Sequence, residues 1–239
     1  MHGRVLSLTL SEVFGPTIQG EGPSSGRRCG FVRLGRCNLT CVWCDTAYTW
    51  DWRGLNGDAY DPLVELSRSE VPVVVEEILA MEVPMVVITG GEPLLQQRGL
   101  ADLCRRFSEE GLRIEVETNG TIEPTAEVAE LVDGFNVGLK LANSGVSETR
   151  RLDPVAIDAF VRLGASFKFV ASATGDLAEI HRITDSHSIP ADRVWVMPQG
   201  TTAEQVIGAG RLLADAVCEA GWNLSTRLHV LAWGDTRGR

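Results

Sequence analysis

Short apolar runs rich in β-branched residues alternate along the chain with longer stretches whose apolar residues recur at helical spacing. The runs predict buried strands and the stretches predict helices. The expected strands are 31–34, 85–89, 113–117, 135–139, 167–170 and 193–196. The expected helices are 72–83, 95–110, 126–132, 154–163, 175–185 and 203–220. Such alternation predicts an α/β fold with a parallel sheet. Six units are too few for a closed barrel of eight, so we expect a partial, open (β/α)6 TIM-like barrel.

Two segments lie outside this alternation. Residues 50–69 contain glycines, a proline and little periodicity, which predicts a surface excursion. Residues 228–233 are strand-like and are expected to pack against the barrel or a second subunit. Because 239 residues, 44% of them hydrophobic, are enough for one sizeable core, we expect a single domain over 1–239.

The charge of the chain bears on its partners. A formal net charge of -10 argues against nucleic acid, because phosphate binding usually needs a basic stripe. No apolar run approaches the roughly 20 residues of a membrane span. Residues Met1–Arg4 also lack the basic and then apolar layout of a signal peptide. We therefore expect a soluble cytoplasmic protein with no nucleic-acid or membrane partner.

The spacing of the cysteines indicates metal ligands rather than disulfides. Three of them lie within eight positions, directly after the first expected strand: Cys37, Cys41 and Cys44. Thiolates are the usual ligands of iron–sulfur clusters, and three of them leave one iron open. A zinc site is the alternative, for which Cys29 is the nearest fourth ligand. Cys104 and Cys218 fall in helical patterns and are expected to be small core residues.

A second motif, Thr89-Gly90-Gly91-Glu92-Pro93, follows the next expected strand. Glycines allow close backbone approach and a carboxylate can pair with an ammonium group, although alone the motif could be an ordinary turn into a helix. Together with the cysteine spacing, it resembles the radical S-adenosylmethionine (SAM) superfamily. The resemblance implies that superfamily's partial barrel, a 4Fe-4S cluster on the three cysteines, and SAM on the open iron.

The same resemblance implies which residues contact SAM. They are Trp43, Asp45, Gly91, Glu92, Lys140, Met197 and Gln199. Trp43 could instead be only a hydrophobic cover for the cysteine loop. Lys140 corresponds to a Ser-Pro-Lys segment in which Gly138 and Leu139 replace the first two residues here, and an ordinary surface lysine is its alternative.

The segment from Phe14 to Gly22 resembles the substrate segment of 7-carboxy-7-deazaguanine synthases, and the resemblance continues to the C-terminus. The implied substrate contacts are Ile18, Gln19, Gly20, Glu21, Arg33 and Thr89. Arg33 lies on the opposite strand face from its apolar neighbours and would grip the substrate carboxylate, with a structural salt bridge as the alternative. Thr46 would bind Mg2+, or else belong to a simple helix cap or turn.

The family resemblance implies conversion of 6-carboxy-5,6,7,8-tetrahydropterin to 7-carboxy-7-deazaguanine with loss of ammonia. Glu117 and His229 are candidates for moving protons, although either could be purely structural. A reducing partner such as flavodoxin or ferredoxin and a homodimer are also expected. Another radical SAM enzyme, such as a glycyl-radical activase, and a zinc-binding interaction module are the rival functions. Neighbouring enzymes decide whether the product serves queuosine in tRNA or a secondary deazapurine.

Overall fold

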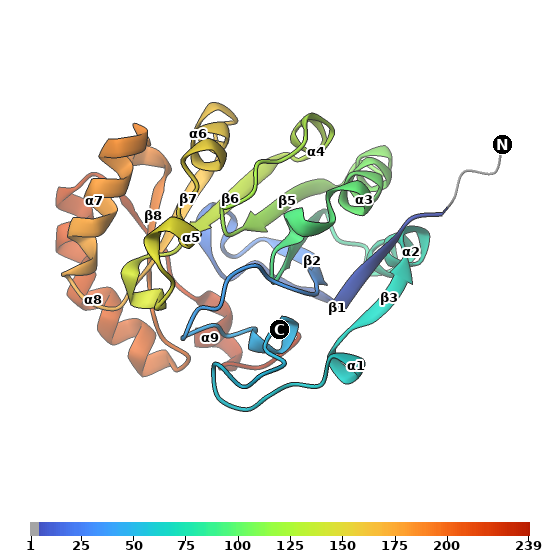
Figure 1. Ribbon diagram of the computed structural model, residues 1–239, viewed down its shortest axis with the longest axis horizontal. Coiled ribbons are helices and arrows are strands. Elements are labelled where there is room, and N and C mark those ends of the chain that lie inside the picture. Colours follow the sequence, from blue (N-terminus) through green and yellow to red (C-terminus); the bar gives the residue numbers. More distant parts are fainter. Residues whose placement is uncertain (1–4) are drawn as a thin grey trace.

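A computed structural model describes residues 5–239. It contains one sheet of nine strands in the order β3-β1-β2-β4-β5-β6-β7-β8-β9 (Figure 1). Residues Met1–Arg4, on which the prediction about a signal peptide rests, lie outside the described residues.

The central strands of the sheet are parallel and match the predicted ones. They are β2 (Arg28–Leu34), β4 (Met85–Gly90), β5 (Arg113–Thr118), β6 (Gly134–Leu139), β7 (Ser166–Ala171) and β8 (Val194–Pro198). Each predicted strand corresponds to one of these, so the open partial barrel is confirmed. The β-branched runs located them because such residues fit a pleated surface covered by helices.

Helices cover the outer face of this sheet (Figure 1). The six that follow the parallel strands or precede β4 are α2 (Val71–Leu79), α3 (Gln97–Glu109), α4 (Ala126–Leu131), α6 (Pro154–Arg162), α7 (Asp176–His187) and α8 (Ala203–Glu219). Side-chain caps fix several starts. Thr125 caps α4, Asp153 caps α6, and Thr202 forms a capping box with Gln205 at α8. Two further helices are single turns, α1 (Pro62–Glu65) and α5 (Glu148–Arg151).

The alternation of side chains along each strand separates the core from the site. In β7, Phe167 and Phe169 are fully buried in the main core beneath the helices, whereas Lys168 between them lines an inner cavity. In β5, Val116 belongs to the core and Glu117 to the cavity. The apolar core therefore lies outside the sheet, and the concave inner face is left for polar side chains.

The N-terminal part of the sheet was missed by the sequence analysis. Strand β1 (Ser7–Ile18) runs antiparallel to β2, and β3 (Ser67–Glu70) pairs with β1. The pairing of β1 with β2 shifts register twice, between Leu10 and Glu12 and between Phe14 and Thr17. Each shift interrupts the two-residue alternation by which a strand is read from sequence.

The predicted strand at 228–233 is wrong, because these residues form helix α9 (Leu228–Trp233). Leucine and alanine favour helices, and Gly234 ends this one with a φ of 71°. The sheet edge is taken instead by the short strand β9 (Asn223–Leu224), which pairs with β8.

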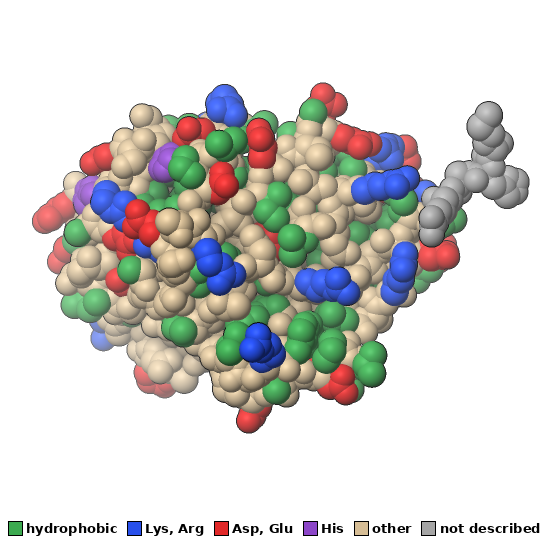
Figure 2. Space-filling view, viewed as in Figure 1, with side chains coloured by type: hydrophobic (Ala, Val, Ile, Leu, Met, Phe, Trp, Pro, Cys, Tyr) green, Lys and Arg blue, Asp and Glu red, His purple; other side chains and the backbone are tan. Residues whose placement is uncertain are grey.

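The expected excursion at 50–69 is exposed over most of its length after its first two residues. Trp50 and Asp51 are buried, and the excursion ends in β3. Between them, Leu63 and Val64 of α1 are 90% and 77% exposed. Hydrophobic side chains gather on the lower part of the face drawn in Figure 2, in the region where Figure 1 places α1.

Two smaller predictions can also be compared with the structure. Cys104 is buried in the core as expected, but Cys218 is exposed on α8, so its assignment to the core is wrong. None of the helices within residues 5–239 combines the length and the apolar composition needed to cross a membrane.

Candidate active site

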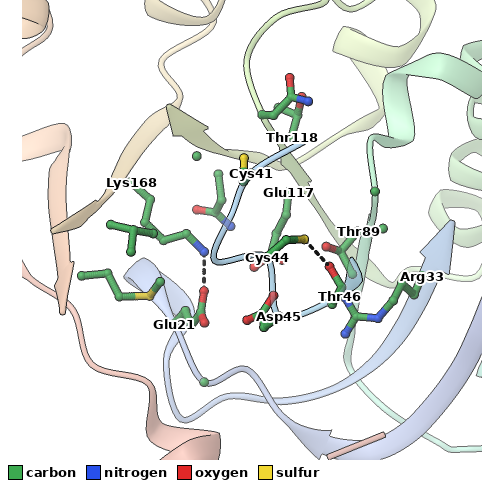
Figure 3. Close-up of a pocket in the computed structure, with 18 of the residues that line it drawn as sticks. Glu21, Arg33, Cys41, Cys44, Asp45, Thr46, Thr89, Glu117, Thr118 and Lys168 are labelled. Carbon is green, nitrogen blue, oxygen red and sulfur yellow. Dashed lines mark hydrogen bonds and ion pairs between the residues drawn. The ribbon is translucent and has the colours of Figure 1, made fainter. Parts of the chain in front are cut away.

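A cavity opens at the C-terminal ends of the parallel strands and encloses about 1170 Å³ together with its mouth (Figure 3). Ligand sites in α/β folds with parallel sheets usually lie at this edge. It brings together nearly all of the predicted site residues: Ile18, Gln19, Gly20, Glu21, Arg33, Cys37, Cys41, Trp43, Cys44, Asp45, Thr46, Thr89, Gly91, Glu117, Lys140, Met197 and His229. Glu92 and Gln199 are the two that do not line it.

The three cysteines of the loop after β2 face this one cavity. Cys37 and Cys44 pack against a small apolar cluster that contains Cys41 and Leu39. The indole N–H of Trp50 donates to Cys44 Sγ at 3.3 Å. Burial raises the pKa of the Cys37 thiol to about 12 and also raises that of Cys41. Within residues 5–239, no three His, Cys, Asp or Glu side chains are already gathered as a metal site.

The Gly90-Gly91-Glu92 turn is pressed against the start of the cysteine loop. The amide of Gly91 donates to Leu34 O at 3.0 Å, and that of Glu92 donates to Arg36 O at 2.8 Å. A Cβ on Gly91 would lie 2.1 Å from Arg36 O and 2.9 Å from Cys37 Cβ. Glycine is therefore required here because two backbones meet, and the turn fixes where the cysteine loop begins.

The side chain of Glu92 points behind the cavity wall. It is 0% exposed and accepts hydrogen bonds from Leu94 N, Thr118 Oγ1 and Asn119 N at 2.9, 2.9 and 2.7 Å. Burial raises its pKa, although these donors and Lys140 act in the opposite direction. The residues of the motif that reach the cavity are Thr89, Gly90 and Gly91, and contact between the Glu92 carboxylate and SAM stays a prediction.

Lys140 and Trp43 lie together on the cysteine side of the cavity. The Lys140 Nζ is 5.6 Å from the centre of the Trp43 ring, and the indole N–H donates to Asn143 O at 3.0 Å. Gly138 leaves space for this lysine, since a Cβ there would lie 3.2 Å from Lys140 Nζ. Lys140 is thus a lining residue of the cavity rather than a lysine of the outer surface.

A second cavity adjoins the first at the end of β8. Gln199 lines only this one, and several residues line both: Trp43, Asp45, Val170, Met197 and Arg227. Of the predicted SAM contacts, Met197 therefore belongs to the wall that the two cavities share, and Gln199 lies on the second cavity.

The segment after β1 carries the predicted substrate contacts into the cavity. Gln19 Nε2 donates to Glu117 Oε1 at 3.0 Å, and the Gln19 Oε1 accepts from the amide of Glu21 at 3.2 Å. Gly20 lies against helix α9: its carbonyl accepts from Leu228 N at 2.8 Å, and a Cβ on it would meet His229 Nδ1 at 1.9 Å. Only glycine permits this approach, and the segment is thereby fixed in place.

Glu21 is the centre of a largely buried ion network. Its carboxylate pairs with Lys168 of β7 (Figure 3), accepts from Arg227 Nε at 3.1 Å, and lies 4.0 Å from His229 Nε2. Burial alone would raise the pKa of Glu21, but Lys168, Arg227 and His229 together lower it. Burial lowers the pKa of His229, an effect only partly offset by Glu21. Glu21 is therefore ionised across the neutral range, and His229 is biased toward its neutral form.

Arg33 both forms a salt bridge and faces the cavity. Its Nε donates to Glu12 Oε1 at 2.7 Å, and the hydroxyl of Tyr48 donates to the same oxygen at 2.7 Å. The structural salt bridge considered from sequence is thus present, while the side chain still lines the cavity along with Thr89. The ion pair holds the guanidinium at the wall and does not remove it from the site.

Asp45 and Thr46 follow the last cysteine directly. Thr46 Oγ1 lies 3.6 Å from Cys44 Sγ (Figure 3), and the Asp45 carboxylate pairs with Arg227. Thr46 precedes a short 3-10 turn (Ala47–Thr49), but its side chain makes no capping hydrogen bond. Both side chains line the cavity, and both carry oxygen atoms, which are the ligands that a hard cation prefers.

Sequence reasoning missed three charged residues that line the cavity, Lys168, Arg227 and Arg239. Lys168 could have been found, because it lies between two phenylalanines on a strand, as Arg33 lies between Val32 and Leu34. Arg227 carried no such signal. It meets Glu21 from 206 positions away, and only the folded chain joins them.

Comparison with known proteins gives concordant similarities. The radical SAM superfamily model matches residues 32–163. The chain is 38% identical over 230 residues to a 7-carboxy-7-deazaguanine synthase of Pyrobaculum aerophilum, covering 95% of this chain and 96% of the relative. It is 34% identical over 228 residues to one of Hyperthermus butylicus, covering 94% and 92%. The crystal structure of QueE from Escherichia coli matches with a TM-score of 0.70 at 22% identity, covering 93% and 95%, which is a similarity of fold.

Proposed function

Because the chain belongs to the 7-carboxy-7-deazaguanine synthase family of radical SAM enzymes, we propose that it converts 6-carboxy-5,6,7,8-tetrahydropterin to 7-carboxy-7-deazaguanine with loss of ammonia. It is a lyase of 7-deazapurine biosynthesis. The observation that carries this proposal is that one cavity joins the three cysteines, the two glycines of the Gly-Gly-Glu turn and the polar Gln19–Glu21 segment. A glycyl-radical activase would need the first two but not a segment suited to a small heterocycle.

The residues present fit the cofactors that radical SAM enzymes use. Cys37, Cys41 and Cys44 would hold a 4Fe-4S cluster, with SAM beside it along Trp43, Lys140 and Met197. When bound, the cluster supplies the electron that cleaves SAM to the radical that removes hydrogen from the substrate. The cysteine loop would draw its three thiols together around the iron. The protein itself binds, orients and excludes water.

The Gln19–Glu21 segment would recognise the amino and amide edge of the pterin. A carboxylate offers about four acceptor positions. Lys168 and Arg227 each use one on Glu21, on different oxygens. Both oxygens of Glu21 therefore keep acceptor capacity for the N–H groups of the heterocycle.

The substrate carboxylate would lie at the opposite wall, with Arg33, Thr46 and Thr89. We propose that Arg33 pairs with it and that Thr46 would hold a Mg2+ ion, which would supply positive charge beside the carboxylate. Oxygen donors and few protein ligands are typical of magnesium sites. Together, Arg33 and this cation would orient the substrate carboxylate relative to the reacting carbon.

Proton movement is assigned to His229 and Glu117. Burial lowers the pKa of His229 and so favours the neutral imidazole, which is the form that can accept a proton. Glu117 accepts a hydrogen bond from Gln19, so its carboxylate lies beside the pterin segment. Either group can then exchange a proton with the ring as it contracts.

The remaining partners are also proposals. A small one-electron carrier such as flavodoxin or ferredoxin would reduce the cluster at the loop that exposes Val42. A homodimer would cover the apolar side chains Leu63, Val64 and Trp233, since Arg237 ties the end of the chain to Glu65 of α1 at 2.8 Å. Sedimentation tests the dimer, and cytoplasmic location stays a prediction.

Anaerobic reconstitution tests the function. The protein is loaded with iron and sulfide, then given dithionite, SAM, Mg2+ and the carboxypterin, and products are followed by mass spectrometry. We expect 7-carboxy-7-deazaguanine, lost with Cys41→Ala and retained with the matched exposed variant Cys218→Ala. Arg33→Ala should raise KM, whereas Arg162→Ala on the outer surface should not. SAM cleavage without this product would contradict the proposed identity of the substrate. A protein that takes up no iron would contradict the whole proposal.

A further inference from the structure

Arg227 joins three segments that are distant in sequence. Its Nε donates to Glu21 Oε1 at 3.1 Å, its Nη1 donates to Gly200 O at 2.7 Å, and its Nη2 pairs with the Asp45 carboxylate. The side chain is 7% exposed. The three contacts of Arg227 link the proposed pterin segment, the loop after β8 and the loop after the cysteines.

The position of Arg227 makes these contacts more than a local salt bridge. It lines both the main cavity and the second one, as Asp45 does. Glu21 lies on the main cavity, and Gln199, next to Gly200, lies on the second one. The guanidinium is therefore part of the wall between the proposed pterin site and the proposed SAM site.

The chemistry of the side chain suits this position. A guanidinium carries five N–H donors in a rigid plane, so three contacts in different directions fix its orientation. Burial would lower the pKa of Arg227, but Glu21 and Asp45 raise it, and the group stays charged. A displacement of any one of the three segments must move the plane or break a charge-assisted hydrogen bond.

We propose that Arg227 is a positioning residue that couples the binding of the pterin to the binding of SAM. The inference rests on the proposed function for the identity of the two ligands. When SAM binds, it orders Asp45 and the 199–201 loop, and these two segments align Arg227. Arg227 then holds Glu21 in the orientation that receives the heterocycle. Coupling of this kind is reciprocal, so the pterin must strengthen SAM binding by the same factor.

The test is SAM binding to the anaerobically reconstituted enzyme, by calorimetry, with and without the carboxypterin and Mg2+. In the wild type we expect the pterin to strengthen SAM binding by about 5-fold to 150-fold, the usual range for coupled sites. Arg227→Gln should reduce that factor to near one. Arg227→Lys should restore only part, because an ammonium lacks the planar fork. Arg162→Gln, on the outer surface, should keep the wild-type factor.

A second variant keeps the proposal testable if Arg227→Gln does not fold, as judged by circular dichroism. Asp45→Asn weakens the ion pair between Asp45 and Arg227 at a side chain that is 39% exposed. It should therefore lower the coupling factor as well. An uncoupled wild type, or a folded Arg227→Gln or Asp45→Asn enzyme with the full factor, would overturn the inference. Product formation by the wild type tests the proposed function separately, since turnover does not require the two ligands to be coupled.

Discussion

The contact between the Gly-Gly-Glu turn and the cysteine loop makes Gly91→Ala a sharp test of how the cluster site is built. The new Cβ would lie 2.1 Å from Arg36 O, about 1.3 Å closer than the 3.4 Å at which ordinary contact begins. The obstacle is backbone, so the loop that starts at Cys37 must move by roughly an ångström. Overpacking of this kind costs about 1–3 kcal/mol. In a chain of this size that lowers Tm by about 2–12 °C.

The functional effect should exceed the loss of stability. A misplacement of about 1 Å in a reacting group can reduce the rate about 100-fold. We therefore expect the Gly91→Ala protein to be folded at about 20 °C, which is below its Tm. It should bind less iron than the wild type and lose most of its turnover. Iron content, thermal unfolding and product formation measure the three effects.

The matched control is Gly208→Ala in α8, where an added Cβ has no atom within 4 Å. A helix generally gains about 1 kcal/mol from this exchange, so Tm should rise slightly while iron content stays unchanged. If Gly91→Ala binds iron and turns over like the wild type, the turn does not fix the cysteine loop and the reasoning fails.

Three other predictions concern the substrate side. Gly20→Ala brings a Cβ to 1.9 Å from His229 Nδ1, so steady-state kinetics should show KM for the pterin raised about tenfold or more. Burial alone would raise the pKa of Glu21, but its lysine and arginine partners lower it below the ordinary 4.5. Its stabilising effect is complete above pH 4.5 and is lost as the pH falls toward the folded pKa, so urea unfolding from about pH 6 to about pH 3 should show the wild type losing stability more steeply than Glu21→Gln. Chelation of Mg2+ should lower turnover in the wild type more than in Thr46→Val, and added Mg2+ should restore only the wild type; equal responses would contradict a ligand role for Thr46.

The parallel part of the fold was predictable from sequence because each buried strand is a short β-branched run followed by a helical pattern. Strand β1 was not, since its register shifts interrupt the alternation that identifies a strand. The strand predicted at 228–233 was wrong because a short apolar run fits a strand or a helix equally well. Their helical form depends on Gly234 and on the contact of Leu228 with Gly20.

The candidate site was predictable where its residues follow strand ends or carry a family motif. The cysteines, Gly91 and Lys140 belong to this class, and all of them line the cavity. The direction of Glu92 could not be read from the motif, because it depends on donors from Thr118, at the end of β5, and from Asn119 directly after it. Arg227 depends wholly on tertiary structure.

The pterin segment and the residues that hold it are joined across most of the chain, which sets an order of assembly during synthesis. Glu21 pairs with Lys168 from 147 positions away and with Arg227 from 206. At about 5–20 residues per second, the ribosome makes Arg227 roughly 10–40 s after Glu21. The cysteine loop meets its Gly-Gly-Glu anchor far earlier, after about 55 residues at the same rate. A nascent chain can therefore shape the place for its cluster well before it has any place for the pterin.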